Sequence, residues 1–343
     1  MPTTVTSTIK SSGGDYTSLS AWEAAKQGDL VTLDQIQQAE CYAFQDTTAF
    51  TINGWTTDAT RYIRIFAAAG AEAKMPYNTS TSYRLEPATG TADVIRVQED
   101  FVRIERIQLT VIKSGANAAR FGINYGPGGT LGAAVPYLEG CVIRGQITAG
   151  SGGGSFGIKC SDNSPVYRCS NTVVYDFNDA TNIGIGYPTD ITSGLAYWHN
   201  NTVVNCTTGY RGVPTNGQAG SRVTNCLYDS QGLAGADGFG NTFHSGSNYN
   251  CSDLAADAPG ANSRNSQTTT YVDEAGDDFH LASGDVSCKD FGTDLSADAS
   301  YPITVDFDWV TRTGTWDIGA DEFVAAAASM PIFPTPMAHL LVR

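Results

Sequence analysis

Residues 168–175 read Arg-Cys-Ser-Asn-Thr-Val-Val-Tyr, and residues 198–205 read Trp-His-Asn-Asn-Thr-Val-Val-Asn. In both stretches an asparagine precedes a short run of β-branched residues that is typical of a strand. The pattern recurs downstream in Arg222–Asp229 and Ser247–Ser252, and more weakly upstream in residues 102–111 and 138–143. The aligned residues are Arg106, Gly140, Asn171, Asn201, Asn225 and Asn250, at spacings of 34, 31, 30, 24 and 25 residues.

The recurrence of Asn and Gly at one position has a physical cause. These residues adopt the left-handed backbone conformation at the lowest cost, so a turn that needs a positive φ in every repeat selects them. Stacked asparagines can also hydrogen-bond along the stack. A fixed turn with loops of variable length is typical of a parallel β-solenoid, whose coils stack about 4.8 Å apart. The sequence therefore predicts an all-β, single-chain parallel β-helix with a turn stack of Gly140, Asn171, Asn201, Asn225 and Asn250.

The residue after each turn position is expected to point to one side of the stack. These residues are small and mostly apolar, which favours the interior. The predicted interior column is Ile107, Cys141, Thr172, Thr202, Cys226 and Cys251. Cys226 and Cys251 would then lie in adjacent coils, as stacked free thiols or, alternatively, as a disulfide.

The two ends of the chain depart from the repeat, as the exposed ends of a solenoid require. Residues 15–26 predict a short helix with Leu19, Trp22 and Ala25 on one face. The repeat stops near Ser252. We therefore predict an N-terminal cap over residues 1–60, coils over 61–260, a C-terminal capping segment over 261–324 and an extended apolar tail over 325–343.

The tail is the most apolar part of the chain outside the repeat. Exposed, it would be an aggregation hazard, so it is expected to dock on a partner. The residues predicted to make that contact are Ile332, Phe333, Met337, Leu340 and Leu341. The alternative is that the tail folds back on its own chain.

Composition excludes several classes of protein. The chain carries 20 Lys+Arg against 35 Asp+Glu, a net charge of −15, which argues against a nucleic-acid partner. No apolar run is long enough to cross a bilayer, so no membrane partner is predicted. The N-terminus lacks the basic and apolar regions of a signal peptide. The eight cysteines show no CxxC pair and no zinc-like spacing with the four histidines. We expect no cofactor and no metal.

The search for a catalytic site concentrates on carboxylates, because glycan hydrolysis needs an acid and a base on one face. The aspartates within the coils do not recur in one column and are interpreted as solvated turn residues (Asp162, Asp176, Asp179, Asp190, Asp229 and Asp237). Two acidic groups near the C-terminus are interpreted as a turn and a capping network, with calcium binding as the alternative. These are Asp273, Glu274, Asp277 and Asp278, and Asp317, Asp321 and Glu322. No catalytic residue is assigned.

Stretches outside the repeat carry a family resemblance. They are Gly14–Ala24, Asp278–Leu281, Arg312 and Trp316–Glu322. With the coils, they resemble the right-handed parallel β-helix repeat family of secreted bacterial and phage proteins over roughly residues 10–323.

The resemblance implies a right-handed coil and a phage origin. Together with the regular stack of coils, the missing signal peptide, the lack of an assigned catalytic group and the apolar tail, it favours a structural virion protein: a decoration, head-fibre or spike subunit of a phage particle. Such a protein would be a homotrimer, docked on other virion proteins through its tail, with a surface glycan as a further ligand. The alternatives are a glycan-degrading enzyme and a secreted adhesin.

Overall fold

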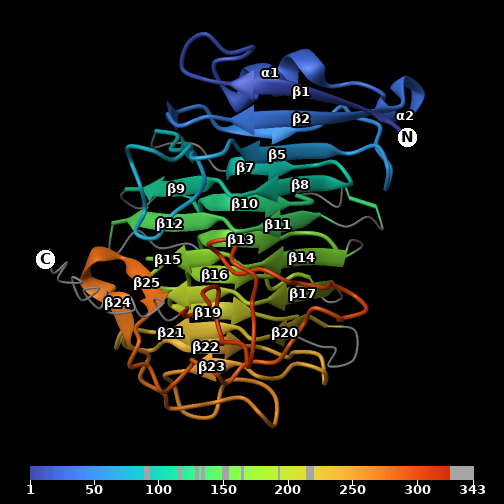
Figure 1. Ribbon diagram of the computed structural model, residues 1–343. Helices are drawn as coiled ribbons and strands as arrows, with labels where there is room; N and C mark the ends of the chain where they lie inside the picture. Colours follow the sequence, from blue (N-terminus) through green and yellow to red (C-terminus); the bar gives the residue numbers. More distant parts are fainter. Residues whose placement is uncertain are drawn as a thin grey trace, which may run out of the picture.

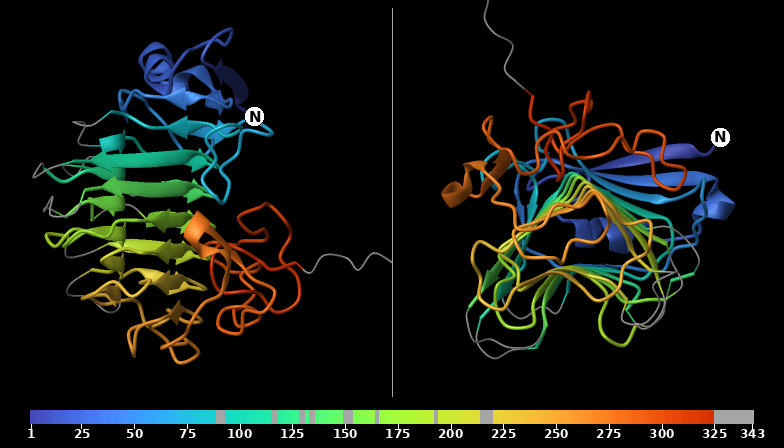
Figure 2. Two further views of the ribbon diagram at one scale, coloured as in Figure 1. Left: turned by 90° about the vertical axis from the view of Figure 1, so that its left-hand side faces the viewer. Right: turned by 90° about the horizontal axis from the view of Figure 1, so that it is seen from below.

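The computed structural model describes residues 1–88, 93–114, 118–127, 131–132, 136–148, 154–163, 166–191, 194–213 and 220–324. Three long parallel sheets run along one axis and form the body of the molecule (Figures 1 and 2). The chain passes from sheet 1 to sheet 2 to sheet 3 and then returns to sheet 1, one coil further along. The fold is therefore an all-β parallel solenoid, as the spacing of the turn residues predicts.

Each sheet takes one strand from each successive coil. Sheet 1 contains β1 (Thr3–Ile9), β2 (Gln35–Cys41), β5 (Ile63–Ala67), β8 (Val102–Glu105), β11 (Tyr137–Glu139), β14 (Val166–Ser170), β17 (Leu195–His199) and β20 (Arg222–Thr224). Sheet 2 contains β3 (Gln45–Asp46), β6 (Arg84–Leu85), β9 (Gln108–Lys113), β12 (Val142–Ile147), β15 (Val173–Tyr175), β18 (Thr202–Val204), β21 (Leu227–Asp229) and β23 (Cys251–Ser252). Sheet 3 contains β4 (Phe50–Ile52), β7 (Asp93–Val97), β10 (Phe121–Tyr125), β13 (Phe156–Cys160), β16 (Ile183–Gly186), β19 (Thr208–Arg211) and β22 (Asp237–Gly240).

The sheets begin earlier than the predicted start of the coils at residue 61. Strands β1 to β4 lie within residues 1–60, and β1 pairs with β2 along its whole length. Helix α1 (Leu19–Lys26) packs against β1, β2 and β4 and buries Leu19 and Trp22. It begins at Ser18, whose side chain accepts a hydrogen bond from the Ala21 amide at 3.1 Å. A second short helix, α2 (Leu30–Leu33), follows.

The corner between sheets 1 and 2 holds one residue with left-handed backbone in each of six successive coils. Successive coils place there Arg106, Gly140, Asn171, Asn200, Asn225 and Tyr249, with φ between 48° and 62°. Gly140, Asn171 and Asn225 are the residues the repeat predicts. Asn201 and Asn250 are not: in those coils the turn residue lies one position earlier. The turn position was misassigned in these two coils for different reasons. Asn201 follows another asparagine, Asn200, that suits the turn equally well. Before Asn250 the turn residue is Tyr249, and tyrosine rarely adopts this conformation.

Asn201 and Asn250 instead form a polar ladder at the next position. The Asn201 Oδ1 atom accepts from the Thr172 amide at 3.0 Å, and Asn250 Oδ1 accepts from the Cys226 amide at 3.0 Å. Both residues are fully buried. The expected bonding between coils is therefore present, but in the column after the left-handed residue.

The same shift of one residue changes which side chains face the interior. The register pairs Val142, Val173, Thr202, Leu227 and Cys251 in one column on the outer face of sheet 2. Thr202 and Cys251 were therefore wrongly predicted to be interior, because a slip of one residue turns a strand side chain to the other face. Cys141, Thr172 and Cys226 share the column with Asn201 and Asn250. The Cys251 amide donates to Cys226 O at 2.9 Å, but the two side chains point to opposite faces of the sheet, and Cys251 packs with Cys288 under the C-terminal segment. All eight cysteines are buried and free.

The interior is apolar and narrow. Ile, Val and aromatic side chains fill it, including Tyr125, Tyr210 and Trp198. Sheet 3 places a glycine at one register position in five successive coils: Gly122, Gly157, Gly184, Gly209 and Gly238. A Cβ atom on Gly157 would lie 2.4 Å from Val174 Cγ1. These glycines let sheet 3 approach sheet 2, which accounts for part of the high glycine content.

The C-terminal segment does more than follow the last coil. Residues 271–324 return along the side of the body, cover the outer face of sheet 2 and, through residues 295–303, cover part of the outer face of sheet 1 (Figure 2). They include the antiparallel pair β24 (Tyr271–Asp273) and β25 (Asp278–Leu281), joined by a 3₁₀ turn, Glu274–Gly276. Two corner asparagines hold the segment: Asn171 Nδ2 donates to Val305 O at 3.0 Å, and Asn225 bonds both Thr293 N and O.

The tail predicted to dock on a partner lies outside the described residues, with Ile332, Phe333, Met337, Leu340 and Leu341. Within the described ranges, the helices are too short and too polar to cross a bilayer.

Candidate functional site

The outer face of sheet 1 carries charged and aromatic side chains in register. Strand pairing aligns Arg64, Arg103, Tyr137 and Arg168 in one column. Two residues further along the strands, Glu105 is paired directly with Glu139. Because alternate residues of a strand face the same side, both columns point outward, opposite to the buried Ile104 and Leu138.

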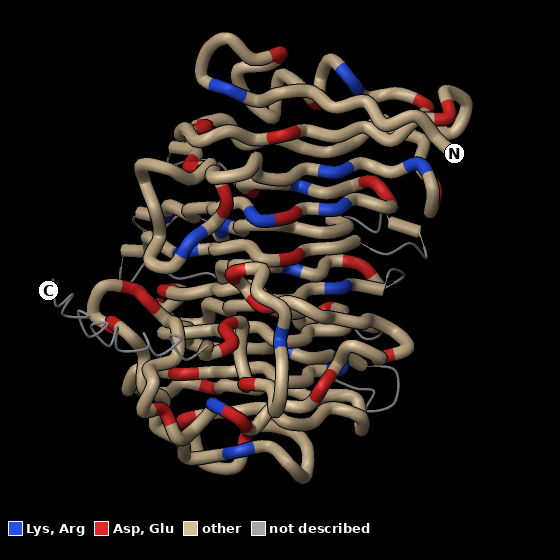
Figure 3. The backbone as a smooth tube through the Cα atoms, viewed as in Figure 1, with Lys and Arg blue, Asp and Glu red and all other residues tan. Residues whose placement is uncertain are grey.

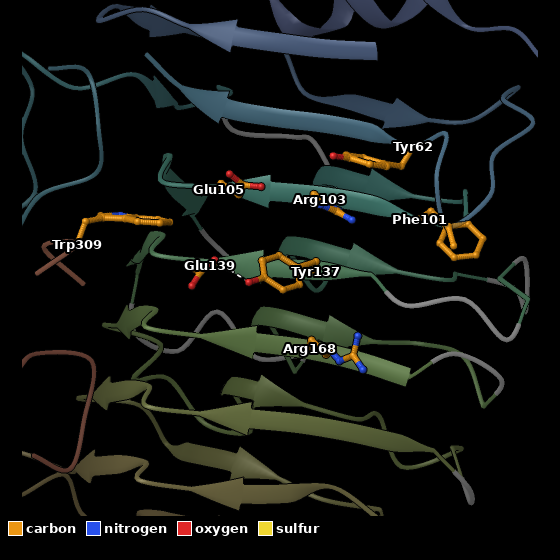
Figure 4. A pocket seen from close by; sticks show the side chains of 9 residues that line it. Tyr62, Phe101, Arg103, Glu105, Tyr137, Glu139, Arg168 and Trp309 are labelled. Carbon is orange, nitrogen blue, oxygen red and sulfur yellow. Dashed lines mark hydrogen bonds between the residues drawn. The ribbon is translucent and has the colours of Figure 1, made fainter. Parts of the chain in front are cut away.

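These side chains line a groove of about 460 Å³ (Figure 4). The C-terminal segment contributes one wall through Trp309, and the coil entering β8 contributes Phe101. The lining residues are Ala59, Tyr62, Phe101, Arg103, Glu105, Tyr137, Glu139, Arg168 and Trp309.

Glu105 is held in place by an arginine. The Arg64 guanidinium contacts both of its carboxylate oxygens, with Nε at 3.0 Å from each. Bidentate arginine–carboxylate pairs are among the strong charged interactions in proteins. Glu105 therefore brings an oriented carboxylate, neutralised by Arg64, to the floor of the groove.

Glu139 has a different environment, although it occupies the neighbouring position. The Tyr137 hydroxyl donates to Glu139 Oε2 at 2.7 Å. Burial raises the pKa of Glu139; the hydrogen bond from Tyr137 opposes this shift, and the charge of Glu105 adds to it. Two carboxyl groups with separate environments therefore lie on adjacent strands.

Two aromatic residues of the groove have unfavourable backbone conformations. Phe101 has φ 52° and Trp309 has φ 65°. Left-handed backbone is uncommon for bulky residues, and such strain concentrates at functional sites. The Arg106 guanidinium lies 4.5 Å from the centre of the Trp309 ring and fixes its position. The fold thus holds these two rings at the edges of the groove at a cost in backbone energy.

The residues singled out by the repeat lie elsewhere. The turn residues form the corner beside the groove, and the six aspartates of the coils are absent from its lining. The glutamate pair was missed although the repeat contains its signal. Glu105 directly precedes Arg106, and Glu139 directly precedes Gly140, so both occupy the position before an aligned turn residue.

The acidic groups near the C-terminus make protein contacts. Asp317 accepts the amides of Asp290 and Phe323, each at 2.6 Å, and Asp321 accepts that of Leu281 at 2.7 Å. Glu322 accepts from Arg312 at 3.0 Å. This is the capping network that the sequence predicts, and it ties β25 and the segment after it together.

One cluster in the same region has a donor set that could hold a cation: His280, Asp308 and Asp321 each place one atom within 4.8 Å of the others. His280 already bonds on both sides, to Asp278 and, at 2.9 Å, to Asp308. Burial lowers the pKa of His280, but its bonds to Asp308 and Asp278 and the charge of Asp321 raise it to about 9. A protonated His280 is therefore the cation of this cluster.

Comparison of the chain with protein-family models, with curated proteins and with solved structures gives no match.

Proposed function

We propose that the protein binds a saccharide chain in the groove on the outer face of sheet 1. The observation that carries the proposal is the pairing of strained aromatic walls, Phe101 and Trp309, with a floor of oriented charged groups. Sugars present apolar C–H faces, which stack on aromatic rings, and hydroxyls, which need carboxylate and guanidinium partners. The groove offers both over three successive coils.

The rigidity of the site supports the proposal. The floor residues stand on β8, β11 and β14, whose strand ladders fix them at a regular spacing of about 4.8 Å. A preorganised surface loses little freedom when a ligand binds, so modest contacts suffice for affinity.

The test is a glycan array probed with the full chain, followed by calorimetry on the glycans that bind. Tyr62→Ala and Trp309→Ala should each weaken binding about tenfold, because each removes an aromatic contact with the sugar. Phe291→Ala is the matched control, because Phe291 is exposed outside the groove. Equal effects of all three changes, or no binding by the wild type, would contradict the proposal.

Cleavage of the bound glycan is a second candidate, favoured by the glutamate pair. Glu139, with its raised pKa, would donate its proton to the leaving oxygen, and the ionised Glu105 would attack the sugar carbon before water releases the product. Directly paired residues on adjacent strands start about 4.8 Å apart, close to the roughly 5 Å between the carboxyl groups of retaining glycosidases.

This candidate is tested on the glycans that bind. New reducing ends should form with the wild type and should disappear in Glu139→Gln, while calorimetry shows that the variant still binds. Binding without cleavage by the wild type would leave a glycan-binding protein.

We also propose a structural role on a phage particle, in which the body is a right-handed β-helix closed at its first coil by α1. The support is the family resemblance together with the long, regular stack of coils. In this proposal the protein is a homotrimer, and residues 325–343 dock it on other virion proteins. A trimer mass in solution for the full chain, and density for the body on particles seen by electron microscopy, are the expected results. A stable monomer that associates with no particle would contradict this role.

A further inference from the structure

Arginines in the described part of the chain divide into two groups. Most make an ion pair with a carboxylate: Arg61, Arg64, Arg84, Arg96, Arg106, Arg144, Arg222 and Arg312. The others show no such pair among the described residues: Arg103, Arg120, Arg168, Arg211 and Arg264. Of these, Arg103 and Arg168 line the groove. A protein with a net charge of −15 thus keeps two cationic groups without carboxylate partners on the floor of its candidate site.

Both guanidinium groups are positioned by contacts that leave donors free. Arg103 lies over the Tyr62 ring, 3.7 Å from its centre. Arg168 donates through Nη2 to Ser300 O at 2.6 Å, and its buried Nε atom has no hydrogen-bond partner among the described residues. An arginine has five N–H donors. The buried Nε of Arg168 is out of reach of a ligand, so Arg168 offers its Nη1 donors, and Arg103 offers its guanidinium edge.

The charges around them do not neutralise them. Glu105 is neutralised by Arg64, and Arg106 by Glu72 at 2.8 Å. Glu139 accepts a hydrogen bond from Tyr137, and burial raises its pKa. A planar anion is the ligand that matches a guanidinium fork, and carboxylates bind it through two parallel hydrogen bonds.

The spacing of the two arginines adds a constraint on the ligand. Arg103, Tyr137 and Arg168 follow one another in register, so the two arginines are two strands apart, or roughly 10 Å. That distance is about the length of a disaccharide. Tyr137 lies between them, where a sugar without a charge would contact its ring (Figure 4).

We propose that the groove selects acidic saccharides in which a carboxylate recurs at about every second sugar, with Arg103 and Arg168 each binding one carboxylate. This inference rests on the proposed glycan binding and names the class of glycan.

Calorimetry with defined oligosaccharides tests it. The probes are an octasaccharide that alternates glucuronate with N-acetylglucosamine, a hexagalacturonate, a sulfated oligosaccharide without carboxylates, and neutral cellohexaose. We expect the alternating acidic probe to bind tightest and cellohexaose weakest. Arg103→Gln and Arg168→Gln should each weaken the acidic probe by about 10- to 100-fold, the usual worth of a hydrogen bond to a charged group.

Two further variants separate charge from general damage. Arg103→Lys keeps the charge without the planar fork and should give an intermediate affinity. Arg211→Gln removes a cation from sheet 3, outside the groove, and should leave binding unchanged. A sulfated probe that binds as well as the carboxylated ones would show selection for charge alone and would overturn the inference. Equal affinity for cellohexaose would overturn it too, while glycan binding stands. If no oligosaccharide binds, both proposals fail.

Discussion

The outer faces of sheets 1 and 2 belong to the same coils but differ in how far the C-terminal segment covers them. Sheet 2 presents Val142, Val173 and Leu227 outward, and the C-terminal segment buries them under Phe279, Phe307 and Ile318. Sheet 1 presents Arg, Glu and Tyr outward. Residues 295–303 of the C-terminal segment cover part of this face around Tyr197 and His199, and a groove remains open beside Glu105 and Glu139. The interior behind both faces is apolar. The difference in coverage therefore follows from the side chains that point outward from each sheet. An apolar face must be covered, whereas a charged and aromatic face can be left for a ligand.

The contacts that anchor the C-terminal segment, residues 271–324, give the largest expected effect on stability. The Arg312 side chain is fully buried, pairs with Glu322 at 3.0 Å and donates to the carbonyls of Gly319 and Ala320. Arg312→Ala removes the ion-pair partner of the buried Glu322, which keeps only the hydrogen bond from the Asp317 amide, and it removes the donors to the Gly319 and Ala320 carbonyls. We expect a loss of about 3–5 kcal/mol in urea unfolding, because the remaining charge is uncompensated.

The control for Arg312 is a surface ion pair. Arg61→Ala removes the contact with Asp58, where the arginine is 27% exposed, and should cost far less than Arg312→Ala because solvent screens the pair. Similar losses in the two variants would contradict the anchoring role of Arg312.

The covered face itself gives the next effect. Leu227 is 1% exposed and packs beneath the C-terminal segment. Leu227→Ala creates a cavity between the segment and sheet 2 and should cost about 2–5 kcal/mol. Leu33→Ala, at an exposed leucine, should change stability by less than about 0.5 kcal/mol. Hydrogen exchange measured on residues 271–324 should rise in the Leu227 variant before exchange in the coils does.

A pH titration tests the contribution of His280, which joins β25 to Asp308 of the C-terminal segment. The pKa of His280 is raised to about 9 in the folded chain, against about 6.5 when unfolded. Its contribution is therefore fully present below about pH 6.5 and is lost as the pH rises through 9, and it amounts to about 1–3 kcal/mol. The carboxylates facing it are Asp278, Asp308 and Asp321. The difference in unfolding free energy between wild type and His280→Gln should decrease as the pH rises from 6.5 to 9.5. A constant difference would show that the charge of His280 does not stabilise this contact.

The contrast between the two faces also explains what the sequence could reveal. The coils were predictable because each needs a residue with positive φ at the same corner, and Gly140, Asn171 and Asn225 meet that need. The exact register was harder, since Asn200 and Asn201 are both suited to a turn and a slip of one residue moved Thr202 and Cys251 to the wrong face. The path of residues 271–324 depends on contacts with distant coils and leaves no periodic signal. The groove was missed because its glutamates are spread over two coils, and only the alignment of Glu105 with Glu139 brings them together.

The smallest expected effect concerns the open face and is the sharpest test of the comparison. Apart from lining the groove, Arg103 contacts the Tyr62 ring, and both residues are partly exposed. If this face is kept for a ligand, Arg103→Gln and Tyr62→Ala should change the free energy of unfolding by less than about 0.5 kcal/mol, as is usual for surface positions. A loss above about 2 kcal/mol would mean that these side chains stabilise the coil, as Leu227 does on sheet 2. Unchanged stability with weakened glycan binding would separate the two faces by function. Substitution of a residue that only stabilises the fold could weaken binding only by lowering stability as well.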